Sequence, residues 1–164
     1  MFAYEMIVPD SVVRIRDIAD CRPEVRELRD LWESLRGARP MPARADFRPS
    51  DARHLLRHIL LVEIGGPELP RERRYRVRLF GTAQVDYLGV DWTGAYFHDK
   101  TDRASADRFC DLAEAIVAAR EPWVVRGGLF WMPDKPYAQF ESIYLPLSDD
   151  GDVVNMLLGL TIFY

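Results

Sequence analysis

Cysteine and long hydrophobic runs are scarce in this sequence. Its 164 residues include two cysteines. These residues, Cys21 and Cys110, are too few for a disulfide framework and are not spaced as a pair of metal ligands. We expect both to be buried free thiols. No run of about 18 apolar residues is present, and the first residues lack the positive charge and apolar stretch of a signal peptide. We therefore expect a cytoplasmic protein with no membrane partner.

Motifs of catalysis and nucleotide binding are also missing. The glycines of RLFGTAQVDYLGVDWTGAYF, residues 78–97, are too far apart to form G-x-G-x-x-G, and G-x-x-x-x-G-K-S/T does not occur. The nucleophile motif G-x-S-x-G and the zinc motif H-E-x-x-H are absent as well. The net charge is −4, and acidic residues are interleaved with the basic ones, which argues against a nucleic-acid partner. We expect a protein that is not an enzyme.

An amphipathic helix is predicted over about residues 23–36. Its apolar stripe consists of Val25, Leu28, Leu31, Trp32 and Leu35. Pro23 suits the first helical position, and Gly37 suits the position just after the end. Residues 37–49 are rich in proline and arginine and predict a linker. We therefore divide the chain into an N-terminal segment, 1–49, and a folded domain, 50–164.

Five β-strands are predicted in the second part. They are expected at 58–64, 74–81, 123–131, 137–148 and 153–164. The first two form a hairpin and the last three an antiparallel meander. Between the two groups lie a short helix at 82–89 and a longer one at 105–120. The last strand is apolar on both of its alternating faces, so both sides of the sheet should be covered.

This α+β layout, a five-stranded antiparallel sheet with helices between strands two and three and an amphipathic helix in front, resembles a PAS domain. The phrases LWESLRGARPMPARADFRP, RLFGTA, LGVDWTG and LPLSDDGDVVNMLLG are similar to those of a bacterial PAS-like family whose members are mostly uncharacterised. The resemblance covers about residues 28–164. It implies a non-catalytic sensory or regulatory module that binds a small apolar ligand, a signalling protein partner, or both. A small enzyme with its active site in the same pocket, and a purely structural interaction domain, remain the alternatives.

A ligand pocket is expected between the helices and the sheet. Its apolar lining would be Leu79, Tyr87, Trp92, Phe97, Phe109, Tyr144, Met156 and Leu158. Arg78, Asn155 and Thr161 would be its polar anchors. The same aromatic side chains could instead fill the space as a solid core, which is the commoner use of such residues.

No haem, flavin or metal cofactor is expected. His54 and His58 are four residues apart, but no further ligand completes a metal site. His98, beside Asp99, suits a solvated position, and Cys110 lacks the phrase of flavin-binding photosensors.

The apolar stripe of the predicted helix could cover the outer face of its own sheet or that of a second copy of the chain. Of these we favour a closed two-fold homodimer, because such dimers are the commonest soluble oligomers.

Overall fold

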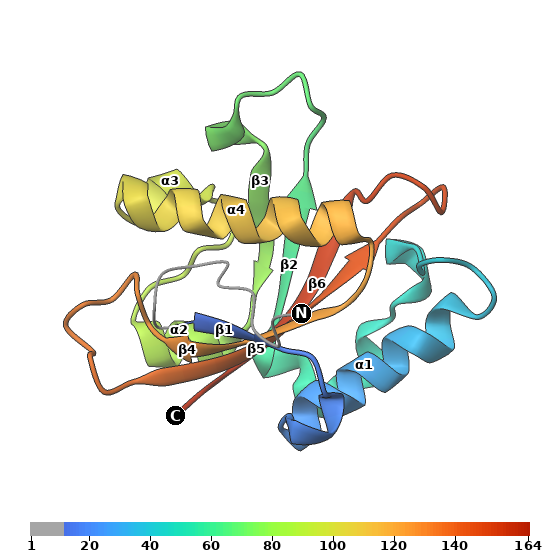
Figure 1. Cartoon of the computed structure of the whole chain (residues 1–164), viewed down its shortest axis with the longest axis horizontal. Coiled ribbons are helices and arrows are strands. Elements are labelled where there is room, and N and C mark those ends of the chain that lie inside the picture. Colours follow the sequence, from blue (N-terminus) through green and yellow to red (C-terminus); the bar gives the residue numbers. More distant parts are fainter. Residues whose placement is uncertain (1–11) are drawn as a thin grey trace.

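The computed structural model describes residues 12–164 and places a six-stranded antiparallel sheet at its centre (Figure 1). The strands are β1 (Val12–Ile15), β2 (Ile59–Ile64), β3 (Tyr75–Phe80), β4 (Trp123–Gly128), β5 (Gln139–Leu147) and β6 (Met156–Phe163). Their order in the sheet is β1-β4-β5-β6-β2-β3. The predicted hairpin and meander are confirmed. The predicted count of five was wrong, because β1 adds an edge strand beside β4.

Four α-helices are present in the described part of the chain. They are α1 (Pro23–Arg36), α2 (Thr82–Leu88), α3 (Phe97–Lys100) and α4 (Arg103–Ala119). Short 3-10 helices lie at Ile18–Asp20, Arg44–Asp46, Pro49–His58 and Arg71–Arg73. The predicted bounds of α1 are confirmed, with Pro23 at its start and Gly37 following at φ 58°. α4 begins after Asp102, whose carboxylate accepts a hydrogen bond from the Ser105 backbone N–H at 3.0 Å.

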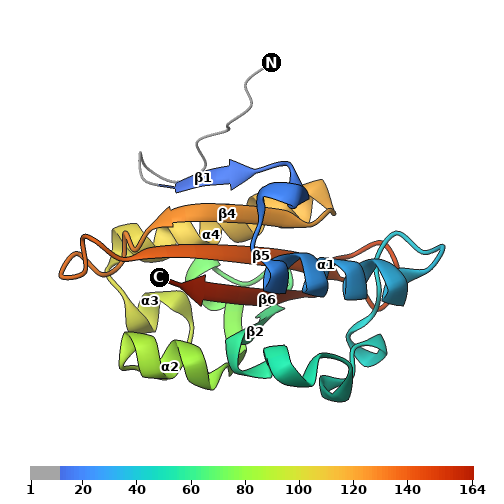
Figure 2. The same ribbon diagram turned by 90° about the horizontal axis from the view of Figure 1, so that it is seen from below.

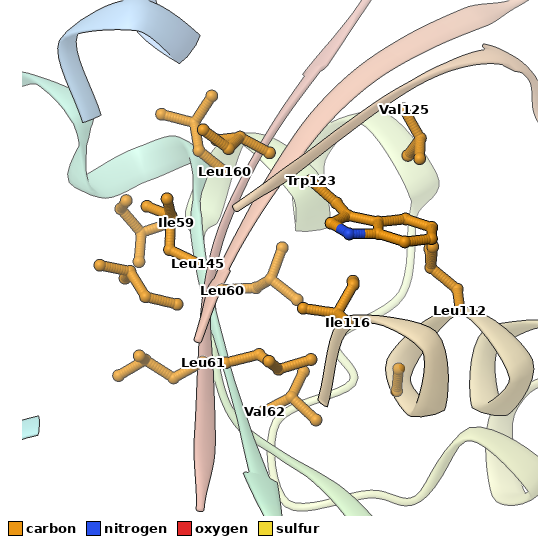
Figure 3. Packing of buried hydrophobic residues seen from close by; sticks show 14 of the residues in the cluster. Ile59, Leu60, Leu61, Val62, Leu112, Ile116, Trp123, Val125, Leu145 and Leu160 are labelled. Atoms are coloured by element: carbon orange, nitrogen blue, oxygen red, sulfur yellow. The ribbon is translucent and has the colours of Figure 1, made fainter. Parts of the chain in front are cut away.

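The helices lie on opposite sides of the sheet. α1 packs on one face and α4 on the other, as Figure 2 shows, where α1 lies in front of the strands and α4 behind them. We call the face under α1 the outer face and the face under α2, α3 and α4 the inner face. In Figure 3, Leu60 and Val62 of β2 point toward Ile116 of α4, whereas Ile59 and Leu160 lie on the other side of the strands. Both faces are therefore covered, as the two-sided apolar pattern of β6 predicts.

A β-bulge interrupts the pairing of β2 with β3. Leu61 pairs with Leu79 and Val62 pairs with Val77, so Arg78 has no partner of its own across this ladder. The extra residue reverses the direction of the side chains that follow it. As a result Leu79 is 40% exposed, while Phe80 turns toward the inner face.

Gly81 ends β3 because no larger residue fits there. Its backbone N–H donates to the Ile59 carbonyl at 2.8 Å, and a Cβ at this position would collide with the Arg57 carbonyl. The chain can therefore turn directly from β3 into α2.

Residues of the predicted N-terminal segment take part in the same core. Met41 and Phe47, from the predicted linker, are buried, and β1 is hydrogen-bonded to β4. The linker therefore holds α1 against the sheet. The division at residue 49 stays a prediction about which part folds on its own.

Candidate functional site

A small cavity of about 70 Å³ lies between the inner face of the sheet and helices α2 to α4. Side chains from the sheet, from α2 and α4 and from the loop between β4 and β5 (residues 129–138, the β4–β5 loop) surround it. The lining is almost entirely apolar, and aromatic rings supply much of it. Its apolar members include Leu60, Val62, Phe80, Trp92, Phe97, Phe109, Leu112, Ile116, Phe130, Trp131, Phe140, Leu157 and Phe163.

The aromatic rings form one connected cluster centred on Phe109 of α4. The Phe109 ring centroid lies 5.8 Å from that of Trp92, 5.0 Å from Phe130 and 5.2 Å from Trp131. Phe80 stacks on Trp92 at 5.7 Å. Rings at these distances and angles attract one another beyond the area that they bury. The cluster joins α4 to the β4–β5 loop.

Three hydroxyl groups form a polar spot on the inner face. Ser142 Oγ and Thr161 Oγ1 lie 2.7 Å apart across β5 and β6, and both residues are buried. Tyr144 follows on the same face of β5 and also lines the cavity. Burial raises the pKa of Tyr144, although its hydrogen bonds to Ser142 and Thr161 oppose that change. Tyr144 therefore keeps its proton at neutral pH and can donate a hydrogen bond.

Further polar groups of the lining differ in whether they have a partner. Gln84 is buried, and its Nε2 donates to the His58 backbone carbonyl at 2.9 Å, so its amide fastens α2 to the start of β2. The indole N–H groups of Trp92 and Trp131 are buried and have no hydrogen-bond acceptor. A buried donor without an acceptor costs free energy, which an added acceptor would recover.

The structure brings five of the predicted pocket residues to the cavity. These are Trp92, Phe97, Phe109, Tyr144 and the polar anchor Thr161. Whether they bind a ligand stays a prediction.

Four residues predicted to line the pocket do not line this cavity. Leu79 is turned outward by the bulge at Arg78. Met156 and Leu158 belong to the outer-facing set of β6, because it is Leu157 and Thr161 that line the cavity and alternate residues of a strand point to opposite faces. Tyr87 stacks on Phe163 at 4.4 Å, beside the cavity rather than around it.

Two of the three predicted polar anchors also lie away from the cavity. Arg78 is exposed, with its Nε 3.9 Å from Glu63 Oε2. Asn155 holds the turn before β6, where its amide donates to Asp149 Oδ2 and its oxygen accepts from the Asp149 backbone N–H, both at 3.1 Å.

Several lining residues were missed by the sequence analysis. Phe130 and Phe140 were assigned to strands without a face, and Phe80 was not expected there because strict alternation puts it on the face opposite to Leu79. Ser142, which pairs with the predicted anchor Thr161, was missed because the two residues meet only through the pairing of β5 with β6.

The histidines and cysteines considered for cofactors lie elsewhere. His98 is not solvated as expected, because its side chain is 12% exposed and its Nε2 lies 2.9 Å from Asp107 Oδ1, away from the cavity lining. Cys21 and Cys110 are buried free thiols, as predicted, and burial raises the pKa of each to about 11. Between residues 12 and 164, no group of three or more His, Cys, Asp and Glu side chains is arranged to hold a metal ion.

These features define an α+β domain in which a single antiparallel sheet carries an aromatic cavity under the helices of one face. The chain belongs to the PAS domain family, because the family's sequence model matches residues 21–162. The predicted membership is thus confirmed. PAS domains are in general sensory or regulatory modules without catalysis, and they commonly bind ligands or proteins. None of the curated proteins compared with the chain matches it. No helix within residues 12–164 is both long enough and apolar enough to cross a membrane.

Proposed function

We propose that this protein is a non-catalytic sensory or regulatory module that binds a small aromatic molecule at the inner face of its sheet. The observation that supports this most is the composition of the cavity. Aromatic rings surround it, and its polar groups are few: the hydroxyls of Ser142, Tyr144 and Thr161 and the unpartnered indole N–H groups of Trp92 and Trp131. Small-molecule sites typically combine an apolar lining with a few polar groups that fix the ligand's orientation.

The size of the cavity predicts how a ligand would act. Its 70 Å³ is well below the roughly 300–1,000 Å³ of typical ligand sites, so a ligand must displace side chains to enter. Phe130 and Trp131 are half-buried and belong to the β4–β5 loop, which makes them the ring-bearing residues best placed to move. Binding would therefore shift this loop, and a signalling partner protein that contacts the loop would detect the shift.

Phenol is a suitable probe, because its one ring and one hydroxyl match the aromatic lining and the hydroxyl group on β5 and β6. We expect phenol to raise the melting temperature of the Phe130→Ala variant, whose shortened side chain enlarges the cavity. The wild type should respond in the same direction at higher phenol concentration. Adding Thr161→Val, which removes a hydroxyl at nearly constant volume, should weaken the response.

The matched control is Leu145→Ala, which also shortens a buried side chain to alanine but opens its cavity on the outer face. This variant should show no greater response to phenol than the wild type. The proposal is wrong if neither the wild type nor Phe130→Ala responds, or if Leu145→Ala responds as strongly as Phe130→Ala.

The cytoplasmic location and the homodimer also stay predictions. In the single chain α1 sits on its own sheet, where Val25, Leu28 and Trp32 are buried and Leu31 and Leu35 are partly buried. A dimer that leaves α1 in place must therefore use another surface. Sedimentation at micromolar concentration would contradict the dimer if it finds only a 19.0 kDa species.

A further inference from the structure

A second, larger cavity of about 540 Å³ opens at the end of the sheet where β1, the turn from α4 to β4 and helix α1 meet. Its volume falls in the range of about 300–1,000 Å³ that small-molecule sites occupy. Five arginines and two glutamates belong to its lining: Arg14, Arg16, Arg29, Arg36 and Arg120 with Glu33 and Glu121. The chain as a whole carries a net charge of −4, so this gathering of arginines is local.

Within residues 12–164, three carboxylates, those of Glu33, Glu121 and Asp152, pair with four of the lining arginines: Arg14, Arg29, Arg36 and Arg120. Glu33 is shared between Arg36, at 2.7 Å, and Arg29, at 3.6 Å. Arg120 lies 3.4 Å from Asp152, but that aspartate side chain is 81% exposed, and exposed ion pairs are weak. An anion inside the cavity would therefore meet several arginines whose charge is only partly compensated.

Arg14 provides the observation that points most directly to a ligand. This residue is 8% exposed, and its guanidinium stacks over the Trp123 ring at 3.9 Å while one of its terminal nitrogens bonds Glu121 at 3.0 Å. Its Nε is buried and has no hydrogen-bond acceptor. Arg14 borders the cavity from the edge of the sheet, and an oxyanion that reached its Nε would supply the missing acceptor and a charge of the right sign.

Arg120 occupies a backbone position that favours glycine. It follows the last turn of α4 with φ 56° and ψ 32°, and it is the non-glycine residue with positive φ in the described part of the chain. Glycine is the usual residue at such a helix end because it has no Cβ to strain. The arginine side chain instead reaches the cavity and donates to the Gly151 carbonyl at 2.9 Å.

The rest of the lining is apolar and includes Ile15, Ile18, Trp32, Pro40 and Pro122. A ligand that matches both parts carries at least two negative charges and a flat apolar portion. We propose that this cavity binds a soluble organic phosphate of that kind, because guanidinium groups bind phosphate oxygens in pairs. This site is separate from the aromatic cavity, and its test does not depend on the outcome for phenol.

Calorimetric titration of the full chain with inorganic pyrophosphate and with ADP tests this proposal at low ionic strength, where surface charge is least screened. We expect saturable binding of both probes at one site per chain, with ADP the tighter because its ring can use the apolar surface. Arg120→Gly removes one guanidinium while placing the favoured residue at the positive φ, so it should fold normally. We expect it to bind either probe about tenfold more weakly. Arg36→Gln should weaken binding by a similar factor.

Arg26→Gln is the matched control, because Arg26 is an exposed arginine of the same helix and does not line the cavity. It should leave the affinity for both probes unchanged. Equal weakening by Arg26→Gln and Arg120→Gly would mean diffuse surface charge and would overturn the proposal. So would the absence of saturable binding in the wild type. Cosedimentation with anionic phosphatidylglycerol vesicles in place of ADP binding would assign the arginines to a lipid headgroup and would also overturn it.

Discussion

The two faces of the sheet are built from different side chains, and they differ in whether their buried polar groups have hydrogen-bond partners. On the outer face, aliphatic residues such as Ile59, Leu145 and Leu160 are at most 1% exposed, and the Trp32 indole N–H donates to the Pro146 carbonyl at 2.9 Å. On the inner face the rings of Phe109, Phe130 and Trp131 are only partly buried, and the indole N–H groups of Trp92 and Trp131 have no acceptor. The comparison indicates that the outer face stabilises the fold and that the inner face is the one suited to change.

A buried ion pair adds to this difference. Glu141 is 1% exposed on the outer face, and its Oε1 accepts from Arg126 at 2.6 and 2.9 Å. Its Oε2 accepts from the Arg22 backbone N–H at 2.7 Å, at the start of α1. The carboxylate thus neutralises an arginine and caps a helix N-terminus at the same time. These contacts raise the pKa of Arg126, which stays charged.

The largest expected effect comes from removing the side chain that closes the outer face. Trp32→Ala deletes a ring that is 3% exposed and also leaves the Pro146 carbonyl without its donor. We expect the free energy of unfolding to fall by about 3–5 kcal/mol, measured by urea denaturation. Leu31→Ala, a partly buried position on the same helix, should cost clearly less. Equal losses for the two variants would contradict the packing of α1 on its own sheet.

A smaller loss is expected when the buried carboxylate is neutralised. Glu141→Gln keeps the shape of the side chain but leaves Arg126 without its counterion and weakens the bond to the Arg22 N–H. Because the Arg126 side chain is 34% exposed and can gain water, we expect about 2 kcal/mol rather than the full cost of an unpaired buried charge. Glu33→Gln, in a more exposed ion pair on α1, should cost less than about 1 kcal/mol.

Features that depend on neighbouring residues were predictable from the sequence, and features that depend on strand pairing were not. The bounds of α1 follow from Pro23 and Gly37, which act locally. The outward turn of Leu79 depends on a bulge that forms only when β3 pairs with β2. The role of Glu141 depends on Arg22, a residue 119 positions away along the chain. The aromatic character of the pocket could be predicted from the residue types alone. Ser142 could not be predicted as part of the pocket, because it meets Thr161 only when β5 pairs with β6.

The inner face should tolerate truncation better than the outer face. Trp131→Ala removes a half-buried ring whose N–H has no acceptor, so part of the lost packing is offset by the removal of an unsatisfied donor. We expect about 1–2 kcal/mol of destabilisation in the same urea experiment, less than for Trp32→Ala. A loss as large as that of Trp32→Ala would show that the β4–β5 loop is as firmly packed as α1, and the comparison of the two faces would fail.

The two buried thiols lie on different faces of the sheet, because Cys21 is near Glu141 and Arg126 at the outer face and Cys110 is on α4 above the inner face. Burial raises the pKa of each from its usual 9.0 to about 11. A raised pKa means that the folded state favours the neutral thiol. The burial of each neutral thiol therefore stabilises the folded state fully below pH 9, and this stabilisation is lost as the pH rises from about 9 toward 11.

At pH 8 the same shift of two pKa units lowers the thiolate fraction about a hundredfold, so both cysteines should react slowly with a thiol reagent in the native protein. If the inner layer opens more readily, the Cys21→Ala variant, which retains Cys110, should be modified faster than Cys110→Ala, which retains Cys21. Pyrophosphate or ADP should slow neither reaction selectively, whereas phenol bound in the aromatic cavity should change the rate at Cys110. A reagent can reach each thiol only when the layer that covers it opens. Faster modification of Cys21 than of Cys110 would therefore mean that the outer face opens more readily than the inner face.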